Sequence, residues 1–133
     1  MSIGARTNVQ DFVMVHVGAT TPTVVGEDRS ITHHVTLHGC SIGDRVLVGI
    51  GATIMDGCVI GENSIVAGGS FLKENTVIPP NSIVAGVPAV VKATRDNSAA
   101  NEFNARLYLA NAEGYSREDH RVWAKMVGEE PET

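Results

Sequence analysis

The sequence predicts an all-β fold, a parallel β-helix shaped as a triangular prism, followed by a helical tail. The first observation is a repeat. From Ile42 onward an aliphatic residue returns at every sixth position, at Ile42, Val48, Ile54, Ile60, Val66, Leu72, Ile78, Val84 and Val90. The second is that glycine or asparagine, which tolerate positive φ at a corner, often stands three positions later, at Gly51, Gly57, Asn63, Gly69, Asn75 and Asn81. A period of six fits neither an α-helix nor a simple alternating strand. It fits short strands joined by corners, with the aliphatic side chains stacked inside.

Small and β-branched side chains must fill the interior of this prism. Hydrophobic residues make up 43% of the chain, but aromatic residues only 5%. Two positions before each aliphatic residue stands a small or medium one that fits a narrower inward slot: Cys40, Val46, Ala52, Cys58, Ser64, Ser70, Thr76, Ser82 and Pro88. The two cysteines are therefore interpreted as buried fillers rather than as metal ligands or a disulfide framework.

The aliphatic ladder extends backwards from Ile42 with two irregularities. Its earlier members are Leu37, Ile31, Val25, Val15, Val9 and Ile3. The interval shortens to five residues between Leu37 and Ile42, and it lengthens to ten between Val15 and Val25, where a loop within residues 18–24 is inserted. Both irregularities flank the histidines. A regular scaffold that is interrupted at one place is where function is expected.

The prism is expected to occupy residues 1–92, and a helical tail packed on the prism residues 93–133. Prolines near the end of the repeat lack the N–H donors that would extend the sheet. The tail has apolar residues at helical spacing, which predict a helix over 97–113 that ends at Gly114; they are Ala99, Phe103, Leu107 and Ala110. Residues 116–119 are expected to cap a second short helix through Met126, before a loose terminus at 127–133.

Composition excludes several classes of partner. The chain carries 10 Lys and Arg against 15 Asp and Glu, a formal net charge of −5. It has no basic run, so neither nucleic acid nor an anionic membrane is expected as a partner. No apolar stretch approaches the roughly 20 residues of a membrane-spanning helix, and the first residues lack the hydrophobic region of a signal peptide. A cytoplasmic protein is therefore expected.

The histidines form the candidate metal site. His16 follows Val15 and His38 follows Leu37, so the two occupy equivalent outward positions on successive turns, about 4.8 Å apart. Two imidazoles at that separation can converge on one metal ion. His33 is expected on the second face, around a corner, where it is poorly placed to join them within one chain, but a neighbouring chain could supply it. Packing about a threefold axis would create shared sites, each with three histidines and an open position for water. The alternative is a set of surface histidines.

Three segments carry a resemblance to a known family: Asn8-Val-Gln-Asp-Phe-Val-Met-Val-His16, Ile31-Thr-His-His-Val-Thr-Leu-His-Gly-Cys40 and Ile42-Gly-Asp-Arg-Val-Leu-Val-Gly-Ile-Gly51. Over nearly its whole length the chain resembles the γ-class carbonic anhydrases, hexapeptide-repeat proteins that fold as a left-handed β-helix. The resemblance implies a homotrimer that binds zinc, or iron or cobalt, through His16, His33 and His38. It also implies reversible, zinc-dependent hydration of CO₂ to bicarbonate by a metal-bound hydroxide at the trimer interfaces.

The resemblance also implies roles for residues around the metal. Gln10 matches the family residue beside the metal-bound water, where it can orient hydroxide or hold CO₂, and Asp11 matches a residue that orders the interface. Asn8 either does similar work or turns the chain. Tyr108, with Asn104, resembles a pair on the family's C-terminal helix that approaches the site in some members, and a place on the helix surface is the equal alternative.

Departures from the family pattern leave room for low activity. The chain lacks the family's N-terminal coils with their Arg-Gly-Asp stretch, so its first coil around Ile3 and Val9 is expected to be exposed. Arg6 is kept as a candidate structural or interface residue. The loop over 18–24 has no acid to act as the glutamate shuttle of some members. His34 stands where the family usually has glycine, and it is either a proton shuttle or an exposed bystander.

The charged residues at other corners are expected to have no catalytic role. Asp44 and Arg45 are expected to belong to a salt network, and Asp56 and Glu62 are expected to be solvated corner residues.

Two other functions stay open. Residues 70–89 also resemble the closing coils of hexapeptide-repeat acetyltransferases, which bind coenzyme A between prisms and use a lone histidine as a base without a metal. The other is a metal-binding trimeric scaffold without catalysis. The arrangement of His16, His33 and His38 favours a carbonic anhydrase-like lyase over an acetyltransferase, and the missing N-terminal coils keep the scaffold open.

Overall fold

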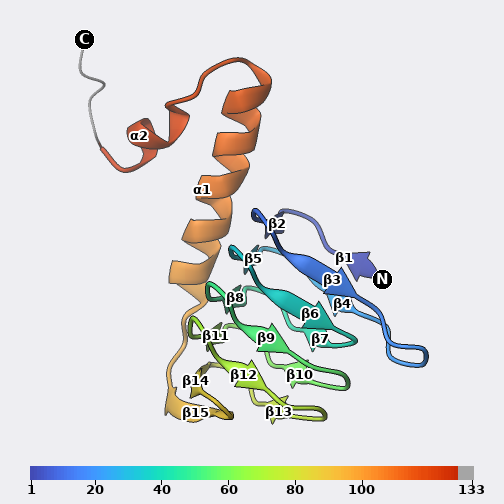
Figure 1. Cartoon of the computed structure of the whole chain (residues 1–133). Coiled ribbons are helices and arrows are strands. Elements are labelled where there is room, and N and C mark those ends of the chain that lie inside the picture. The colour runs from blue at the N-terminus through green and yellow to red at the C-terminus, as the bar shows by residue number, and fades with distance from the viewer. Residues whose placement is uncertain (129–133) are drawn as a thin grey trace.

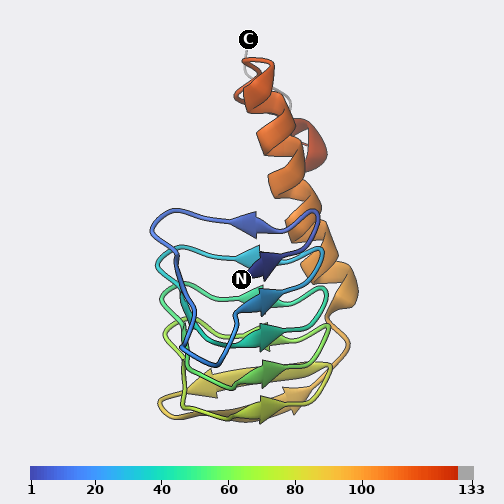
Figure 2. The same ribbon diagram turned by 90° about the vertical axis from the view of Figure 1, so that its right-hand side faces the viewer.

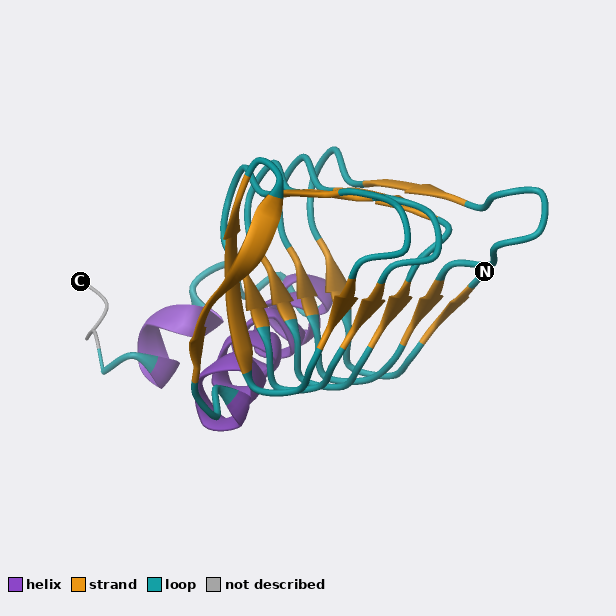
Figure 3. Ribbon diagram, turned by 90° about the horizontal axis from the view of Figure 1, so that it is seen from below, coloured by secondary structure: helices purple, strands orange, loops and turns teal. Residues whose placement is uncertain are grey.

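The structure, a computed structural model that describes residues 1–128, confirms the predicted parallel β-helix with a C-terminal helix. Short strands follow one another around the prism, and each turn of three strands is called a coil here (Figure 1). Viewed from below, the strands line up in rows along the prism, and the helices lie outside it (Figure 3).

The strands form three rows, each of which is one face of the prism. The first face holds β1 (Ser2–Ile3), β4 (Val24–Val25), β7 (Ser41–Ile42), β10 (Val59–Ile60) and β13 (Val77–Ile78). The second holds β2 (Asn8–Val9), β5 (Ser30–Ile31), β8 (Leu47–Val48), β11 (Ile65–Val66), β14 (Ser82–Gly86) and β15 (Ala89–Thr94). The third holds β3 (Met14–His16), β6 (Thr36–His38), β9 (Thr53–Ile54) and β12 (Phe71–Leu72).

The predicted ladder is the core of the prism. Its members from Ile42 to Val84 are at most 4% exposed. The glycines and asparagines predicted at corners all have positive φ, between 59° and 71°. The ladder ends one step earlier than the six-residue count predicts. Val90 is 50% exposed because β15 runs antiparallel to β14 and leaves the parallel stack.

The first coil is open at its upper side, as expected. In residues 1–128 no strand pairs with the free edges of β1, β2 and β3. Ile3 and Val9 point into the prism but remain 42% and 45% exposed.

Helix α1 (Ser98–Ser116) packs along the second face, against β2 and β5. Its apolar spacing predicted the helix but not the side that docks, because Ala99 and Phe103 are exposed. Asparagines hold the helix instead. The buried Asn101 donates its amide hydrogens to the carbonyls of Arg45 and Ser64, at 2.8 and 3.0 Å.

The end of α1 and the following turn differ from the prediction by a few residues. Gly114 lies inside the helix rather than ending it, because α1 continues to Ser116. The following turn packs closely on this glycine, where a Cβ would lie 2.5 Å from Val122 Cγ1 and 2.7 Å from the Asp119 carbonyl oxygen. Helix α2 (Val122–Met126) ends where predicted. The predicted loose terminus falls mainly on residues 129–133, which lie outside the described part. Neither α1 nor α2 is long and apolar enough to cross a membrane.

Candidate metal centre

His16 and His38 lie side by side on the third face. Strands β3 and β6 pair in parallel, and their register places His16 opposite His38. Inward-facing Val15 and Leu37 anchor the two strands, so the histidines that follow them point outward. The centroids of the two imidazole rings are 4.5 Å apart, with the ring planes inclined at 32°. The structure thus brings together the two histidines that the repeat predicted to be neighbours.

Asp56, which the sequence placed among the solvated corners, contacts this pair. Its Oδ2 lies 2.9 Å from His38 Nδ1, and its Oδ1 accepts a hydrogen bond of 2.7 Å from the Thr21 hydroxyl. The hydrogen bond from Thr21 is the main reason that the pKa of Asp56 lies below its ordinary value, and the neighbouring His38 lowers it further. Asp56 is therefore a carboxylate, and it can accept a hydrogen bond from His38 when the proton of that imidazole is on Nδ1. The repeat could have indicated this contact, because the corner that contains Asp56 stacks directly on Gly39.

His33 lies at the edge between the second and third faces, away from the other two histidines. Its Nδ1 is 3.5 Å from Asp11 Oδ2, and its side chain is 40% exposed. Within residues 1–128 of a single chain, no three His, Cys, Asp or Glu side chains converge on a position for a metal ion. One chain therefore offers the His16–His38 pair and, separately, His33 with Asp11 beside it.

Asn8 and Gln10 are joined to each other on the second face. The Gln10 amide donates to Asn8 Oδ1 at 3.0 Å. Asn8 Nδ2 donates in turn to the Arg29 carbonyl and the Ser30 hydroxyl, at 3.0 and 2.9 Å. Asn104 of α1 also donates to Ser30 Oγ, at 2.7 Å. Asn8 is thus an anchor that orients Gln10, because both of its polar atoms are engaged within the chain.

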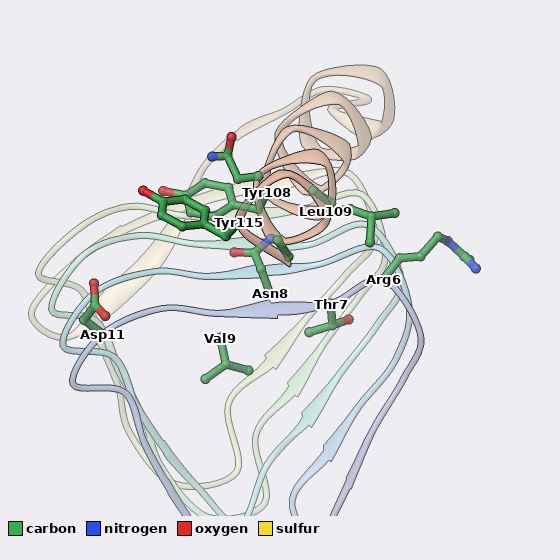
Figure 4. Close-up of a pocket in the computed structure, with 11 residues that line it drawn as sticks. Arg6, Thr7, Asn8, Val9, Asp11, Tyr108, Leu109 and Tyr115 are labelled. Atoms are coloured by element: carbon green, nitrogen blue, oxygen red, sulfur yellow. The ribbon is translucent and has the colours of Figure 1, made fainter. Parts of the chain in front are cut away.

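A pocket of about 600 Å³ lies between the first coil and α1. Figure 4 shows Thr7 and Asn8 below Tyr108, Leu109 and Tyr115, with Arg6 and Asp11 at opposite ends. Tyr108 therefore shares a pocket with Asn8 and Asp11. None of the three candidate ligands, His16, His33 and His38, lines this pocket.

Arg6 forms its ion pairs within its own chain. It lies at the corner between the first and second faces and donates to Asp28 at 2.7 and 3.0 Å and to Glu27 at 2.8 Å. These contacts raise the pKa of Arg6, and the hydrogen bonds from Arg6 lower that of Asp28. The predicted salt network continues below, where Arg45 donates to Glu62 at 3.0 Å.

His34 occupies a corner position with φ +59°, the conformation that favours glycine. Phe12 stands at the corresponding corner of the first coil with φ +63°. The two rings stack at a centroid distance of 4.9 Å and an angle of 8°. His34 is exposed and contacts Phe12 rather than His16 or His38.

Arg29 is a buried charge that sequence reasoning missed. It occupies a narrow inward slot, is 1% exposed, and donates through Nε to the Gly43 carbonyl and through Nη2 to Asp44 at 2.9 Å. Burial lowers the pKa of Arg29 to about 10 although Asp44 opposes the shift. The position of Arg29, two residues before Ile31, could have predicted its burial, because the repeat makes this an inward slot and the other inward slots hold small or β-branched side chains.

Known structures place the chain in a family. A family profile described as bacterial transferase hexapeptide (six repeats) matches residues 39–74. A hexapeptide transferase family protein from Anaplasma phagocytophilum has 33% sequence identity and a TM-score of 0.80, over 85% of this chain and 68% of that one. The chain belongs to the hexapeptide transferase family. Another similar structure, serine acetyltransferase from Brucella abortus in complex with coenzyme A, has 30% identity and a TM-score of 0.53, over 68% of this chain and 40% of that one.

Among curated hexapeptide-repeat proteins, the chain is similar to the γ-carbonic anhydrases. Protein YrdA of Escherichia coli is 48% identical over 63 residues, which cover 42% of this chain and 34% of YrdA. Gamma carbonic anhydrase 1 of Arabidopsis thaliana is 40% identical over 62 residues, 42% of this chain and 22% of that protein. The chain thus spans about a third or less of the length of these relatives, and it is a γ-carbonic anhydrase-like hexapeptide-repeat protein.

A metal ion fits the donor set on the third face. Neutral imidazoles are common ligands of zinc, iron and copper, and a ligating histidine usually donates its other N–H to a carboxylate. His38 has such a carboxylate at Nδ1, which leaves Nε2 available. The buried Cys40 and Cys58 are absent from this set, and burial raises the pKa of the Cys40 thiol to about 12.

Proposed function

We propose that this chain is a carbonic anhydrase-like lyase that hydrates CO₂ reversibly to bicarbonate as a metal-dependent homotrimer. The observation that carries the proposal is the in-register pair His16 and His38, whose rings lie 4.5 Å apart with Asp56 bonded to His38 Nδ1. Similarity to a γ-carbonic anhydrase over 62 residues adds support.

The histidine arrangement supports assembly as a condition for activity. His16 and His38 of one subunit would bind each metal together with His33 of a neighbouring subunit, since one chain does not bring the three together. Exposed apolar side chains accompany these histidines at the same edge and face, namely Phe12, Met14 and Ile50, at 80%, 60% and 59% exposed. An interface between subunits would bury them.

The proposed metal is Zn²⁺, with Fe²⁺ or Co²⁺ as alternatives. When bound by three imidazoles, such an ion supplies a Lewis acid that lowers the pKa of a water ligand to about 7, the chemistry that CO₂ hydration needs at neutral pH. Gln10, held by Asn8, would orient the reacting oxygen or a CO₂ oxygen through its amide. Tyr108 would contribute its hydroxyl from the pocket that it shares with Asn8 and Asp11. Asp11 would orient His33 from 3.5 Å and help to order the interface.

Metal analysis followed by stopped-flow CO₂ hydration tests this function. We expect close to one ion per chain in protein purified without chelator, and hydration that the His38→Ala variant loses. A content below about 0.3 ions per chain that zinc does not restore would contradict a site with three protein ligands. Equal hydration rates for the two proteins would contradict the assigned site.

Shared sites predict different effects for two histidines. The His33→Ala variant should lose metal affinity and trimer cohesion together, because His33 connects subunits. The His16→Ala variant should mainly lose metal affinity, because its partner His38 is on the same chain. Sedimentation velocity at several protein concentrations measures cohesion. A His33→Ala trimer as cohesive as the wild type would contradict the shared site.

Acetyl transfer is the second candidate, favoured by the similarity to a serine acetyltransferase that binds coenzyme A. It predicts binding of acetyl-coenzyme A by the metal-free protein, measured by calorimetry. Binding that survives the His38→Ala change would favour a separate site. Metal at full occupancy with neither hydration nor acetyl-coenzyme A binding would identify a scaffold.

A further inference from the structure

The two irregularities of the six-residue repeat meet at one edge of the prism. The inserted loop (residues 18–24) joins β3 to β4, and the shortened corner follows His38 one coil below. Figure 2 shows the segment between β3 and β4 dropping past the edge of the following coils before it returns to β4. The inserted loop therefore reaches beyond its own coil, to the corner that contains Asp56.

Two glycines make room for this contact. Gly39, directly after His38, has φ +63°, and a Cβ there would overlap Asp56 Oδ1 and lie 2.5 Å from Thr21 Oγ1. A Cβ on Gly18 would overlap Thr21 Oγ1 and lie 2.7 Å from Asp56 Oδ1. The space next to both metal-site strands is thus filled by Thr21 and Asp56 only because glycine stands at residues 18 and 39.

The inserted loop is hydrogen-bonded to His16 directly and is linked to His38 through Asp56. The Thr23 hydroxyl donates to the His16 carbonyl at 2.5 Å and accepts from the Gly39 N–H at 2.9 Å. The Thr21 hydroxyl donates to Asp56 Oδ1 at 2.7 Å, and Asp56 Oδ2 lies 2.9 Å from His38 Nδ1. One threonine therefore fixes the backbone of His16, and the other acts on the ring of His38 through Asp56.

We propose that the inserted loop and Asp56 form a positioning device for the metal-binding pair. Thr21 fixes the Asp56 carboxylate, and Asp56 accepts the Nδ1 proton of His38. Nε2 is then the unprotonated nitrogen, ready to bind a metal before any metal is present. The inference rests on the proposed function only in taking His38 as a ligand, since the tautomer can be measured without metal.

The first experiment reads the His38 tautomer in metal-free protein by long-range ¹⁵N–¹H correlation at mildly alkaline pH. We expect the wild type to carry its proton on Nδ1, and Asp56→Ala to show the mixed tautomers of a histidine without a partner. Glu74→Gln is the matched control, because it removes a carboxylate from the equivalent corner one coil below. An unchanged His38 tautomer in Asp56→Ala would overturn the proposal.

The second experiment measures zinc affinity against a competing chelator. Removing a carboxylate partner of a ligating histidine typically weakens metal binding by roughly 10- to 100-fold, which we expect for Asp56→Ala. Thr21→Val, which keeps the side-chain shape but not the hydroxyl, should weaken binding less. Thr21→Ser should restore wild-type affinity, which a purely structural role of the threonine methyl would not do. Wild-type zinc affinity in both Asp56→Ala and Thr21→Val would overturn the proposal.

The two experiments separate this inference from the proposed function. A wild-type protein that binds no metal but carries the Nδ1-protonated tautomer, lost in Asp56→Ala, would contradict the function and support the positioning device. If the Asp56→Ala variant bound metal and hydrated CO₂ as well as the wild type, and its His38 tautomer were unchanged, the result would support the function and contradict the positioning device. Circular dichroism and sedimentation of each variant show whether it is folded and assembled, and Thr21→Val provides the test if Asp56→Ala does not fold.

Discussion

The upper coils, residues 2–41, and the lower coils, residues 42–84, follow the same repeat but use it differently. From Gly51 onward every corner residue with positive φ in the lower coils is glycine or asparagine, whereas the upper coils place Arg6, Phe12, Asp28 and His34 in that conformation. The inward slot that holds Val46 or Ser64 in the lower coils holds Arg29 in the upper ones. The candidate metal ligands all belong to the upper coils.

This difference teaches how a repetitive fold acquires a site. From Gly51 onward the lower coils satisfy local preference at their corners, and Arg45 with φ 51° is the exception before that point. Agreement between local preference and fold is what makes a sequence specify one structure. The upper coils depart from those preferences at corners, slots and loop lengths, and chemically useful side chains stand at or beside the departures. The lower coils then provide the rigid stack on which the departures are tolerated.

The largest expected effect concerns the core. Ile60 and Ile3 are the same residue type on the same face, but Ile60 is 1% and Ile3 42% exposed. Ile60→Ala should lower the free energy of unfolding by about 2–5 kcal/mol because it leaves a cavity in a closed stack. Ile3→Ala should cost less than about 1 kcal/mol because that side chain remains half in water.

Chemical denaturation of both isoleucine variants at one protein concentration measures this difference, since assembly adds to apparent stability. If both variants lost the same free energy of unfolding, the first coil would be as well packed as the centre of the prism. That result would contradict the contrast between the upper and lower coils.

Two arginines on the same edge provide a smaller test. Arg29→Ala should cost about 2–3 kcal/mol, because it empties a buried slot and leaves the Gly43 carbonyl without its donor. Arg45→Ala should cost at most about 1 kcal/mol, because its ion pair with Glu62 is half exposed and screened by solvent. Thermal and chemical unfolding of the pair check the order, and a larger loss at Arg45 would show that the buried arginine is not a structural element of the upper coils.

The sequence predicted the lower coils almost residue by residue because each repeat reports the same local constraint. The Val84 ladder position and the Asn81 corner followed from counting. The neighbouring positions of His16 and His38 followed from the same count, because parallel pairing brings equivalent positions of successive coils together.

Contacts that depend on the direction of a side chain or on the path of a loop could not be predicted from the repeat alone. The repeat places the corner of Asp56 directly next to Gly39, but the Thr21 hydroxyl that bonds the Asp56 carboxylate belongs to the inserted loop, whose path follows no period. Helix α1 docks through Asn101, whose amide finds corner carbonyls, whereas the prediction relied on apolar spacing. Val90 left the ladder because an antiparallel turn competes with one more parallel strand.

The smallest expected effect concerns two equivalent corners, Gly51 in the lower coils and His34 in the upper coils. It separates the backbone strain of positive φ from the stacking of His34 on Phe12. At Gly51 a Cβ would meet no atom within 4 Å, so Gly51→Ala isolates the backbone cost of positive φ, about 1–2 kcal/mol. His34→Gly should relieve a similar strain but lose the stack on Phe12, which contributes about 0.5–1.5 kcal/mol. We expect the two effects to cancel to within about 1 kcal/mol.

Denaturation and CO₂ hydration of the His34→Gly variant together decide what this corner does. A variant stabilised by the full amount lost in Gly51→Ala would mean that the Phe12–His34 stack contributes nothing. Unchanged hydration identifies His34 as an exposed bystander, whereas slower hydration that buffer restores would identify a proton shuttle. The His34 ring stacks on Phe12 and does not contact the histidine pair. We therefore expect His34 to be a bystander whose stacking offsets the strain of its positive φ.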